Sequence, residues 1–114
     1  MTERGMRVAL IFALAAEQLT VFYEHNQWLT EARSASLAAD WLARAKIKLP
    51  LTERRQLSSL AAQLAHQIQG SLSREAGLYT AHEMMEALDP NYHSEIAESL
   101  MAECERLLDS LSVG

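Results

Sequence analysis

Apolar side chains recur along most of this chain with the spacing of an α-helix. Between Leu57 and Leu72 they fall at i, i+3, i+4 and i+7, and so form one stripe on a helical wheel. The members of this stripe are Leu57, Leu60, Ala61, Leu64, Ile68 and Leu72. No segment has the strict alternation of a half-buried strand. The pattern therefore predicts an all-α protein.

The first two predicted helices are separated by a polar break at Asn26-Gln27. The first runs from about Glu3 to His25. It is apolar nearly all round between Val8 and Ala16, which indicates a helix that its neighbours cover on several sides. The second opens near Thr30, a candidate N-cap, and its last turns are basic, which suits the negative C-terminal end of a helix. Pro50 then disfavours helix at the residue before it, so a short linker is expected there.

The last three predicted helices follow that linker. The third starts at Thr52 as an N-cap, and two endings are open: Gly70 could close it in the left-handed conformation, or the helix could continue to Leu72. Ser73 is expected to cap the fourth helix. Asp89-Pro90 is expected to stop it and to begin the fifth, with Asp89 as the cap, and the fifth runs to about Leu111.

Short connections between helices of similar length favour antiparallel neighbours. We therefore expect residues 1–114 to form a single helical domain, in which the second to fifth helices make an antiparallel four-helix bundle. The first helix would be an additional N-terminal helix that lies across or beside this bundle. A chain of 114 residues is long enough for one ordinary core.

Composition excludes several classes of function. The net charge of −5 argues against a nucleic-acid partner, because such a surface needs a clustered basic face. The single cysteine, Cys104, excludes an internal disulfide, suits a reducing cytoplasm, and is expected to be a small buried hydrophobe. No run of 18 apolar residues occurs, so no membrane span is expected. We therefore expect a cytoplasmic protein, and its oligomeric state stays open.

The N-terminus also resembles a secretory signal, because Arg4 and Arg7 precede an apolar run with an Ala-x-Ala site. Glu3 lies within this basic region, and the run itself is short. The apolar pattern continues through Phe22 and Tyr23 at helical spacing. These features favour a core helix over a cleaved signal.

His66 lies in the third predicted helix, about 180° from the middle of the apolar stripe, so its side chain should point to water. Small residues surround it on the exposed side, namely Ser59, Ala62, Gly70 and Ser73, with Gln63 and Gln69 beside them. An imidazole among small neighbours is accessible to a second protein. A merely solvated histidine is the alternative interpretation.

The residues around His66 resemble the phospho-acceptor motif of the histidine-containing phosphotransfer (HPt) domain, roughly Ala-His-x-(Leu/Ile)-Lys-Gly-(Ser/Ala). The matching residues are Ala65, His66, Ile68, Gly70 and Ser71. Further along, Leu88-Asp89 stands where the family has Leu-Glu. The resemblance covers about a third of the chain.

Two departures from the family motif bear on its chemistry. Gln69 stands where the family has a lysine, which removes a cation that would neutralise a phosphoryl group. The spacing from His66 to Gly77 is one residue longer than in the family, and the extra residue can be absorbed if it lies in a turn.

The resemblance implies a reversible phosphoryl relay. A neutral imidazole nitrogen of His66 would attack the phosphoaspartate of a receiver domain and later pass the group to another receiver. The partner, a response-regulator receiver domain or a hybrid kinase, would supply Mg²⁺, so no cofactor or metal is expected in this chain. The chain would then be a phosphoryl carrier rather than a true enzyme.

The resemblance also assigns roles to the neighbours of His66. Gln69 would donate a hydrogen bond to a phosphoryl oxygen, and Gly70 would permit close approach of the partner backbone. Arg55 would meet an acidic rim on the receiver. The docking face would comprise Arg55, Ser59, Ala62, Gln63 and Ser73. Solvated polar residues and a helix cap are the alternative interpretations of the same positions.

A second hypothesis comes from another class of function. The first helix is more apolar than a peripheral helix needs to be, which suggests a non-catalytic adaptor or chaperone that binds a partner through an apolar groove near that helix. A metal site is not expected. His82, Glu83 and Glu86 form the best metal-like cluster, but no Glu-x-x-His pair occurs.

Overall fold

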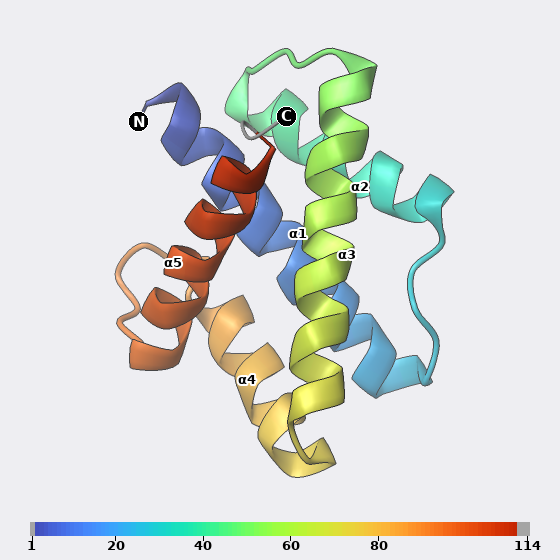
Figure 1. The fold of residues 1–114 in the computed structure, drawn as a ribbon, viewed down its shortest axis with the longest axis vertical. Coiled ribbons are helices and arrows are strands. Elements are labelled where there is room, and N and C mark those ends of the chain that lie inside the picture. Colours follow the sequence, from blue (N-terminus) through green and yellow to red (C-terminus); the bar gives the residue numbers. More distant parts are fainter. Residues whose placement is uncertain (1, 112–114) are drawn as a thin grey trace.

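The computed structural model describes residues 2–111, which contain five helices and no strand. The helices are α1 (Glu3–His25), α2 (Glu31–Ala45), α3 (Leu51–Ser71), α4 (Arg74–Glu86) and α5 (Glu95–Ser110). The prediction of an all-α protein is therefore confirmed for this part of the chain (Figure 1).

The predicted caps of α2 and α4 are confirmed. The Thr30 hydroxyl accepts a hydrogen bond from the Arg33 backbone N–H at 3.1 Å, and the Ser73 hydroxyl accepts one from the Ala76 backbone N–H at 3.2 Å. These contacts satisfy backbone donors that have no partner inside the first turn of a helix.

The predicted start of the last helix is wrong. Ser94, not Asp89, caps α5, and its hydroxyl accepts a hydrogen bond from the Ala97 backbone N–H at 3.2 Å. The Asp89 carboxylate instead accepts one from the Asn91 backbone N–H at 2.9 Å, two residues on. This local contact stabilises a turn. An aspartate carboxylate can accept a hydrogen bond from a backbone N–H in a turn as well as from one in the first turn of a helix, so Asp89 does not by itself mark a helix start. Helix α3 likewise begins one residue before the predicted Thr52 cap, after Pro50, which makes no side-chain cap.

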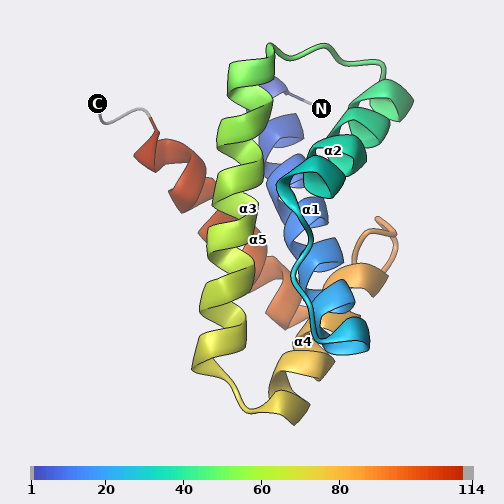
Figure 2. The ribbon, with the colours of Figure 1, turned by 90° about the vertical axis from the view of Figure 1, so that its right-hand side faces the viewer.

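Helix α1 lies at the centre of the molecule and contacts each of the other four helices. Figures 1 and 2 show it enclosed between α3, α5, α4 and α2. Within residues 2–111, α2 contacts neither α4 nor α5. The predicted bundle of the second to fifth helices, with the first helix beside it, is therefore not confirmed.

The physical reason for this arrangement is the apolar surface of α1. Its buried side chains point in all directions, and they are Val8, Leu10, Ile11, Phe12, Ala13, Leu14, Ala15, Ala16, Gln18, Leu19 and Tyr23. A helix that is apolar all round removes most area from water when neighbours surround it. Short connections, on which the predicted bundle rested, constrain only helices that follow one another in the chain.

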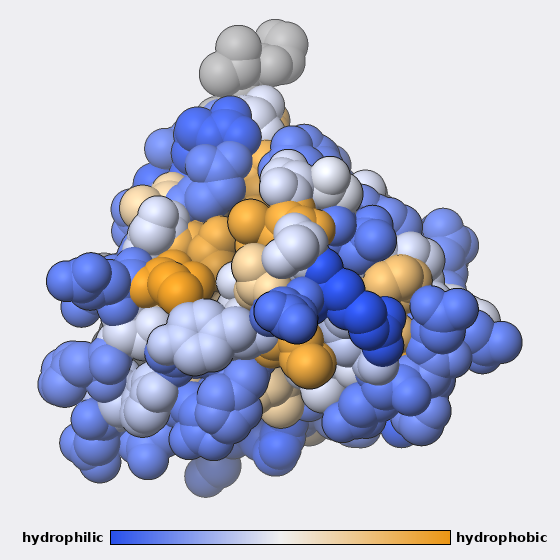
Figure 3. All heavy atoms as spheres, turned by 90° about the horizontal axis from the view of Figure 1, so that it is seen from below, coloured by the Kyte–Doolittle hydropathy of each residue, from blue (hydrophilic) through white to orange (hydrophobic). Residues whose placement is uncertain are grey.

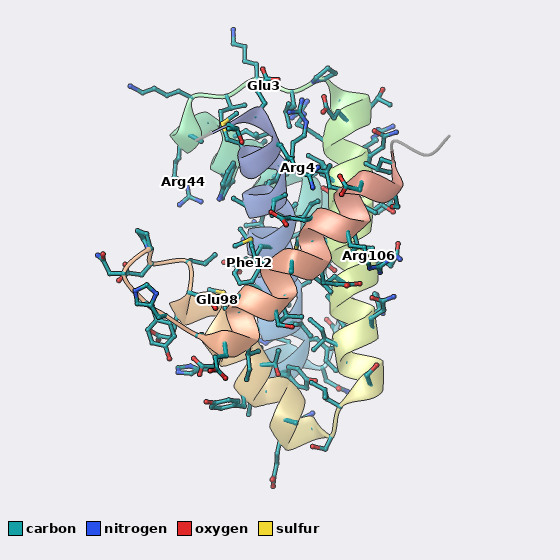
Figure 4. The ribbon with its side chains drawn as sticks, turned by 60° about the vertical axis from the view of Figure 1, so that its left-hand side comes forward. Glu3, Arg4, Phe12, Arg44, Glu98 and Arg106 are labelled. Atoms are coloured by element: carbon teal, nitrogen blue, oxygen red, sulfur yellow. The ribbon has the colours of Figure 1, made fainter. Side chains whose placement is uncertain are left out.

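The largest fully buried side chains come from four helices and meet around α1. They are Phe12, Leu10, Ile11, Leu19, Leu57, Leu64, Met84, Leu107 and Cys104. Figure 4 shows Phe12 on α1 beneath the crossing of α5. Cys104 is 0% exposed, and burial raises the pKa of its thiol to about 12, so it acts as the small buried hydrophobe that was predicted.

Helix α1 is also long and apolar enough to span a membrane, and more than half of that stretch is buried in the structure. Its N-terminal end is joined to the neighbouring helices by ion pairs. Arg7 pairs with Glu53 of α3 where both side chains are half-buried, and Arg4 pairs with Asp109 of α5 at the surface. Figure 4 shows Arg4 reaching toward α5. An exposed pair such as Arg4 with Asp109 contributes little to stability, and both pairs lie at the end of α1, so the position of this helix rests mainly on apolar packing.

Two glycines occupy very different surroundings. A Cβ added at Gly77 of α4 would lie 1.8 Å from the Tyr23 hydroxyl oxygen of α1. Helix α4 can therefore approach α1 this closely only because residue 77 has no side chain. A Cβ added at Gly70 would meet nothing within 4 Å. None of the described glycines has a positive φ, and α3 runs through Gly70 to Ser71. Helix α3 therefore continues past Gly70, and the alternative in which Gly70 closes it is excluded.

The same substitution should have opposite effects at these two glycines. Gly77→Ala should lower the free energy of unfolding by about 1–3 kcal/mol, because the buried Tyr23 ring must shift. Gly70→Ala should raise it by up to about 1 kcal/mol, because alanine is the better helix former at an open position. Urea unfolding of both variants measures the two effects. A Gly77→Ala variant as stable as the parent would contradict the close approach of α1 and α4, and a destabilised Gly70→Ala variant would contradict a continuous α3.

Candidate functional site

His66 lies on the outer face of α3, and its side chain is exposed. At about 100° per residue, the side chains of Arg55, Ser59, Ala62 and Gly70 lie within about 40° of it around the helix axis, and those of Gln63 and Gln69 within about 60°. All of these residues belong to α3. A single regular helix therefore brings most of the expected site residues onto one face.

Two of the expected docking residues lie further from His66 than the rest. Arg55 precedes His66 by eleven residues, or about 16 Å along the helix axis, so its guanidinium belongs to the rim of the face. Ser73 lies beyond the end of α3, after Leu72, whose backbone is extended. Its hydroxyl is already used as the N-cap of α4. The helical-wheel position assigned to Ser73 therefore does not apply.

The indole of Trp28 covers one face of the His66 ring, which the sequence did not indicate. The two ring centroids are 3.9 Å apart and the planes are tilted by 34°. Trp28 lies in the connection between α1 and α2, and its indole stacks on Phe22 at 4.4 Å. His66 is thus flanked by small residues along α3 and by a large aromatic side chain from a loop. A wheel drawn for α3 contains no information about which loop passes over it.

The aromatic contacts continue beyond Trp28. The ring of Phe22 meets that of Tyr23 edge to face at 5.4 Å, and the guanidinium of Arg74 lies 5.7 Å from the centre of the Tyr23 ring. Arg74 also donates a hydrogen bond to the Tyr23 backbone carbonyl at 3.4 Å. This series of rings joins the end of α1, the following loop, α3 and the start of α4. It holds the Trp28 indole in place against His66.

Stacking of this kind constrains the imidazole without enclosing it. A stacked aromatic neighbour contacts the face of the ring, whereas the lone pair of an unprotonated imidazole nitrogen lies in the ring plane and points from its edge. Among the histidines, His25 and His82 approach carboxylates, at 3.8 and 4.0 Å. The His66 edge remains available for a nucleophilic or hydrogen-bonding role.

The cluster His82, Glu83 and Glu86 does not converge. His82 and Glu86 approach each other to 4.0 Å on the outer side of α4, whereas the Glu83 carboxylate is turned toward two tyrosines. Among residues 2–111, no group of three histidine, cysteine or acidic side chains is placed to hold a metal ion.

Glu83 instead forms a hydrogen-bonded group that sequence reasoning missed. The residue is only 9% exposed, and its carboxylate accepts hydrogen bonds from the hydroxyls of Tyr92 and Tyr79, the latter at 2.9 Å. The two hydrogen bonds lower the pKa of the Glu83 carboxyl, and the one from Tyr92 has the larger effect. The same hydrogen bond to Glu83 raises the pKa of Tyr92 to about 12. The group ties the connection between α4 and α5 to α4.

Comparisons of the chain with models of known protein families, with curated proteins and with solved structures found no match. Function must therefore be inferred from the residues and their geometry. The feature that best supports chemistry is the positioned, exposed imidazole of His66.

Removing one tyrosine hydroxyl should change the titration of Glu83. In Tyr92→Phe the pKa of the Glu83 carboxyl should rise toward its ordinary value, because its main hydrogen-bond donor is lost. A carboxyl whose pKa is lowered by folding stabilises the protein above its unfolded pKa, and this stabilisation is lost as the pH falls through the folded value. The variant should therefore lose less stability on acidification than the parent. Carbon-detected NMR titration and urea unfolding between pH 3 and 7 test this, and an unchanged Glu83 pKa would contradict the contact.

The stack of Trp28 on His66 has a direct spectroscopic consequence. Protons of the imidazole lie over the indole face, so its ring current should shift them upfield. In Trp28→Leu the His66 ring protons should move downfield, toward the positions of a free histidine. Trp41→Leu, which changes the other tryptophan, is the control and should leave these signals in place. Equal shifts of the His66 signals in both variants would contradict the stack.

Proposed function

We propose that this chain is a phosphotransfer protein of the HPt type, in which His66 carries the phosphoryl group. The observation that carries the proposal is an exposed imidazole in the C-terminal third of the uninterrupted helix α3, with small side chains before and after it on the same face. The helix continues through Gly70, whose surroundings are open, so a partner backbone can approach one turn beyond His66.

The chemistry requires little of this chain. The lone pair of one imidazole nitrogen attacks phosphorus, the bond from phosphorus to the partner's aspartate oxygen breaks, and the aspartate leaves as a carboxylate. The proton on the other ring nitrogen is then released to water, leaving a phosphoramidate whose imidazole ring is uncharged and whose phosphoryl oxygens carry the negative charge. The partner receiver supplies Mg²⁺ and the groups that bind the phosphoryl oxygens. His66 must therefore only be exposed, unprotonated and correctly oriented.

Trp28 supports this role by fixing the imidazole. Its indole contacts the face of the His66 ring, which restricts the ring orientation and leaves the attacking edge accessible. Gln69, half-buried and one turn beyond His66, provides a neutral hydrogen-bond donor where the family has a lysine. Without that cation, the phosphoryl group on His66 lacks a charge partner on α3, so transfer should depend more strongly on the receiver.

The adaptor hypothesis loses its original basis. The apolar surface of α1 that motivated it is buried among the other helices. The open groove beside the N-terminal end of α1, with a volume of about 630 Å³, is lined largely by charged and polar side chains. Its lining residues are Glu3, Arg4, Arg7, Pro50, Thr52, Glu53, Gln56, Leu57, Leu108 and Leu111. An apolar partner in this groove would also cover charged side chains, which would lose their contact with water.

Transfer from a phosphorylated receiver domain tests the proposal. Receiver carrying radiolabelled phosphate is mixed with the protein in the presence of Mg²⁺, and an acid-labile, alkali-stable label on the chain is measured. His66→Gln should abolish the label while lowering the free energy of unfolding by no more than about 1.5 kcal/mol, the contribution of the lost stack on Trp28. Label that persists in this variant, or that appears on His82 or His93, would reject His66 as the acceptor.

Two substitutions at one position test whether a receiver docks over Gly70. Gly70→Arg places a long side chain one turn from His66 and should slow transfer at least about tenfold, the effect of losing about 1.4 kcal/mol of binding. Gly70→Ala is the matched control, because it adds only a methyl group to open space and should transfer at the parent rate. Parent-like transfer by the arginine variant would contradict docking on this face.

A further inference from the structure

The charges of this chain are divided very unevenly between its two parts. From Glu75 to the C-terminus there are nine acidic residues and one basic residue, Arg106. The preceding residues contain six acidic and nine basic side chains. A net charge of −8 therefore lies between Glu75 and the C-terminus, whereas the preceding residues, which include Arg74 at the start of α4, carry +3. The modest total of −5 conceals this asymmetry.

An apolar groove opens in the acidic part of the molecule. It lies between the end of α3, α4 and the start of α5, and its volume is about 310 Å³. It is lined by Ile68, Leu72, Thr80, Glu95, Ile96, Ser99 and Leu100. Leu72 is 41% exposed. In Figure 3, which views this end of the molecule, apolar surface lies between hydrophilic side chains.

The groove is separate from the face that carries His66. Ile68 follows His66 by two residues, so the two side chains point about 160° apart around α3. His66 is exposed, whereas Ile68 is buried against the core at the floor of the groove. A partner in the groove and a partner at His66 would therefore contact different sides of the same helix.

The lining of the groove excludes most known ways of binding a peptide. Strand addition needs a sheet edge, and residues 2–111 contain no strand. Proline-rich segments bind between aromatic side chains, and phosphorylated segments bind to arginine clusters, but the described lining includes neither. An apolar groove between helices suits the apolar side of another helix, whose side chains at i, i+3 and i+4 project together.

The charge around the groove then specifies the polar side of that helix. Glu95 is the charged residue among those that line the groove. Glu98 lies two residues after Ile96, so its exposed side chain points away from the groove, on the other side of α5 (Figure 4). The one basic residue of α5, Arg106, is paired with Glu103. Opposite charges across an interface speed association and discriminate against acidic partners. A second copy that docked symmetrically, groove against groove, would bring a second acidic part toward this one and would be repelled.

We propose that the groove between α3, α4 and α5 binds a basic amphipathic helix of another protein. Apolar side chains on one side of that helix enter the groove beside Leu72, Ile96 and Leu100, and lysine or arginine side chains flank them and face Glu95. The proposal concerns a surface that phosphotransfer through His66 does not use, so His66→Gln should leave this binding unchanged.

A pair of synthetic peptides tests the proposed occupant. The first is an amphipathic helix of about four turns with leucine at i, i+3, i+4 and i+7 and lysine elsewhere. The second keeps the leucines and replaces each lysine with glutamate. Titration calorimetry and backbone NMR should show the lysine peptide binding, with shifted signals at the groove, and the glutamate peptide binding at least about tenfold more weakly. Equal binding of the two peptides, or no binding of either, would overturn the proposal.

Matched variants of the protein locate the binding. Leu72→Ser should weaken the lysine peptide about tenfold, as for a buried contact at the centre of an interface, while Leu78→Ser, at an exposed leucine outside the groove, should not. Glu95→Gln should weaken binding more at low salt than at high salt. Asp40→Asn, on α2, removes the same charge far from the groove and serves as its control.

Two outcomes would assign the groove differently. If Leu72→Ser and Leu78→Ser bind the peptide as the parent does, the interaction is a diffuse attraction between charges and the groove is not the site. If the parent chain dimerises in sedimentation experiments and Leu72→Ser abolishes the dimer, a second copy occupies the groove. Either result would overturn the proposal.

Discussion

Burial of α1 on all sides is the constraint on which the rest of this structure depends. A helix with apolar side chains around its whole circumference must be enclosed, and four other helices are needed to enclose it. Helix α4 comes especially close to α1 where Gly77 meets Tyr23, because no Cβ separates them. Polar contacts such as the pair between Arg7 and Glu53 lie at the margin of this packing. The hydrophobic effect therefore determines which helices are neighbours, and ionic contacts adjust their ends.

The geometry around His66 follows from where α1 ends. Asn26 adopts the left-handed conformation, which asparagine tolerates better than most residues, and it turns the chain out of α1. Trp28 then lies between Phe22, at the end of α1, and the imidazole on α3. The helical spacing of α3 exposes His66, whereas the position at which α1 ends places the Trp28 indole of the following loop against the imidazole. The candidate acceptor is thus oriented by residues that are distant in sequence.

The two proposed surfaces differ in chemistry and in location. The His66 face offers an imidazole among small side chains, whereas the groove at Leu72 offers apolar side chains with acidic neighbours. They lie on different sides of α3, so this helix would connect two binding events. The Glu83 group, with its two tyrosine donors, holds the connection before α5 and thereby the start of the helix that forms one wall of the groove.

Features that depend on nearby residues were predictable from the chain: five helices, the caps at Thr30 and Ser73, the exposure of His66 and the burial of Cys104. Helical periodicity and capping involve residues within a few turns of one another, so both can be recognised in the amino-acid sequence alone. Asp89 was misassigned because its carboxylate can begin either a turn or a helix, and local sequence does not distinguish the two. The central position of α1, the stack of Trp28 on His66 and the groove beside Leu72 arise only when helices distant in the chain pack together. They are decided by which arrangement removes most apolar area from water, and that quantity belongs to the assembled fold rather than to any segment of it.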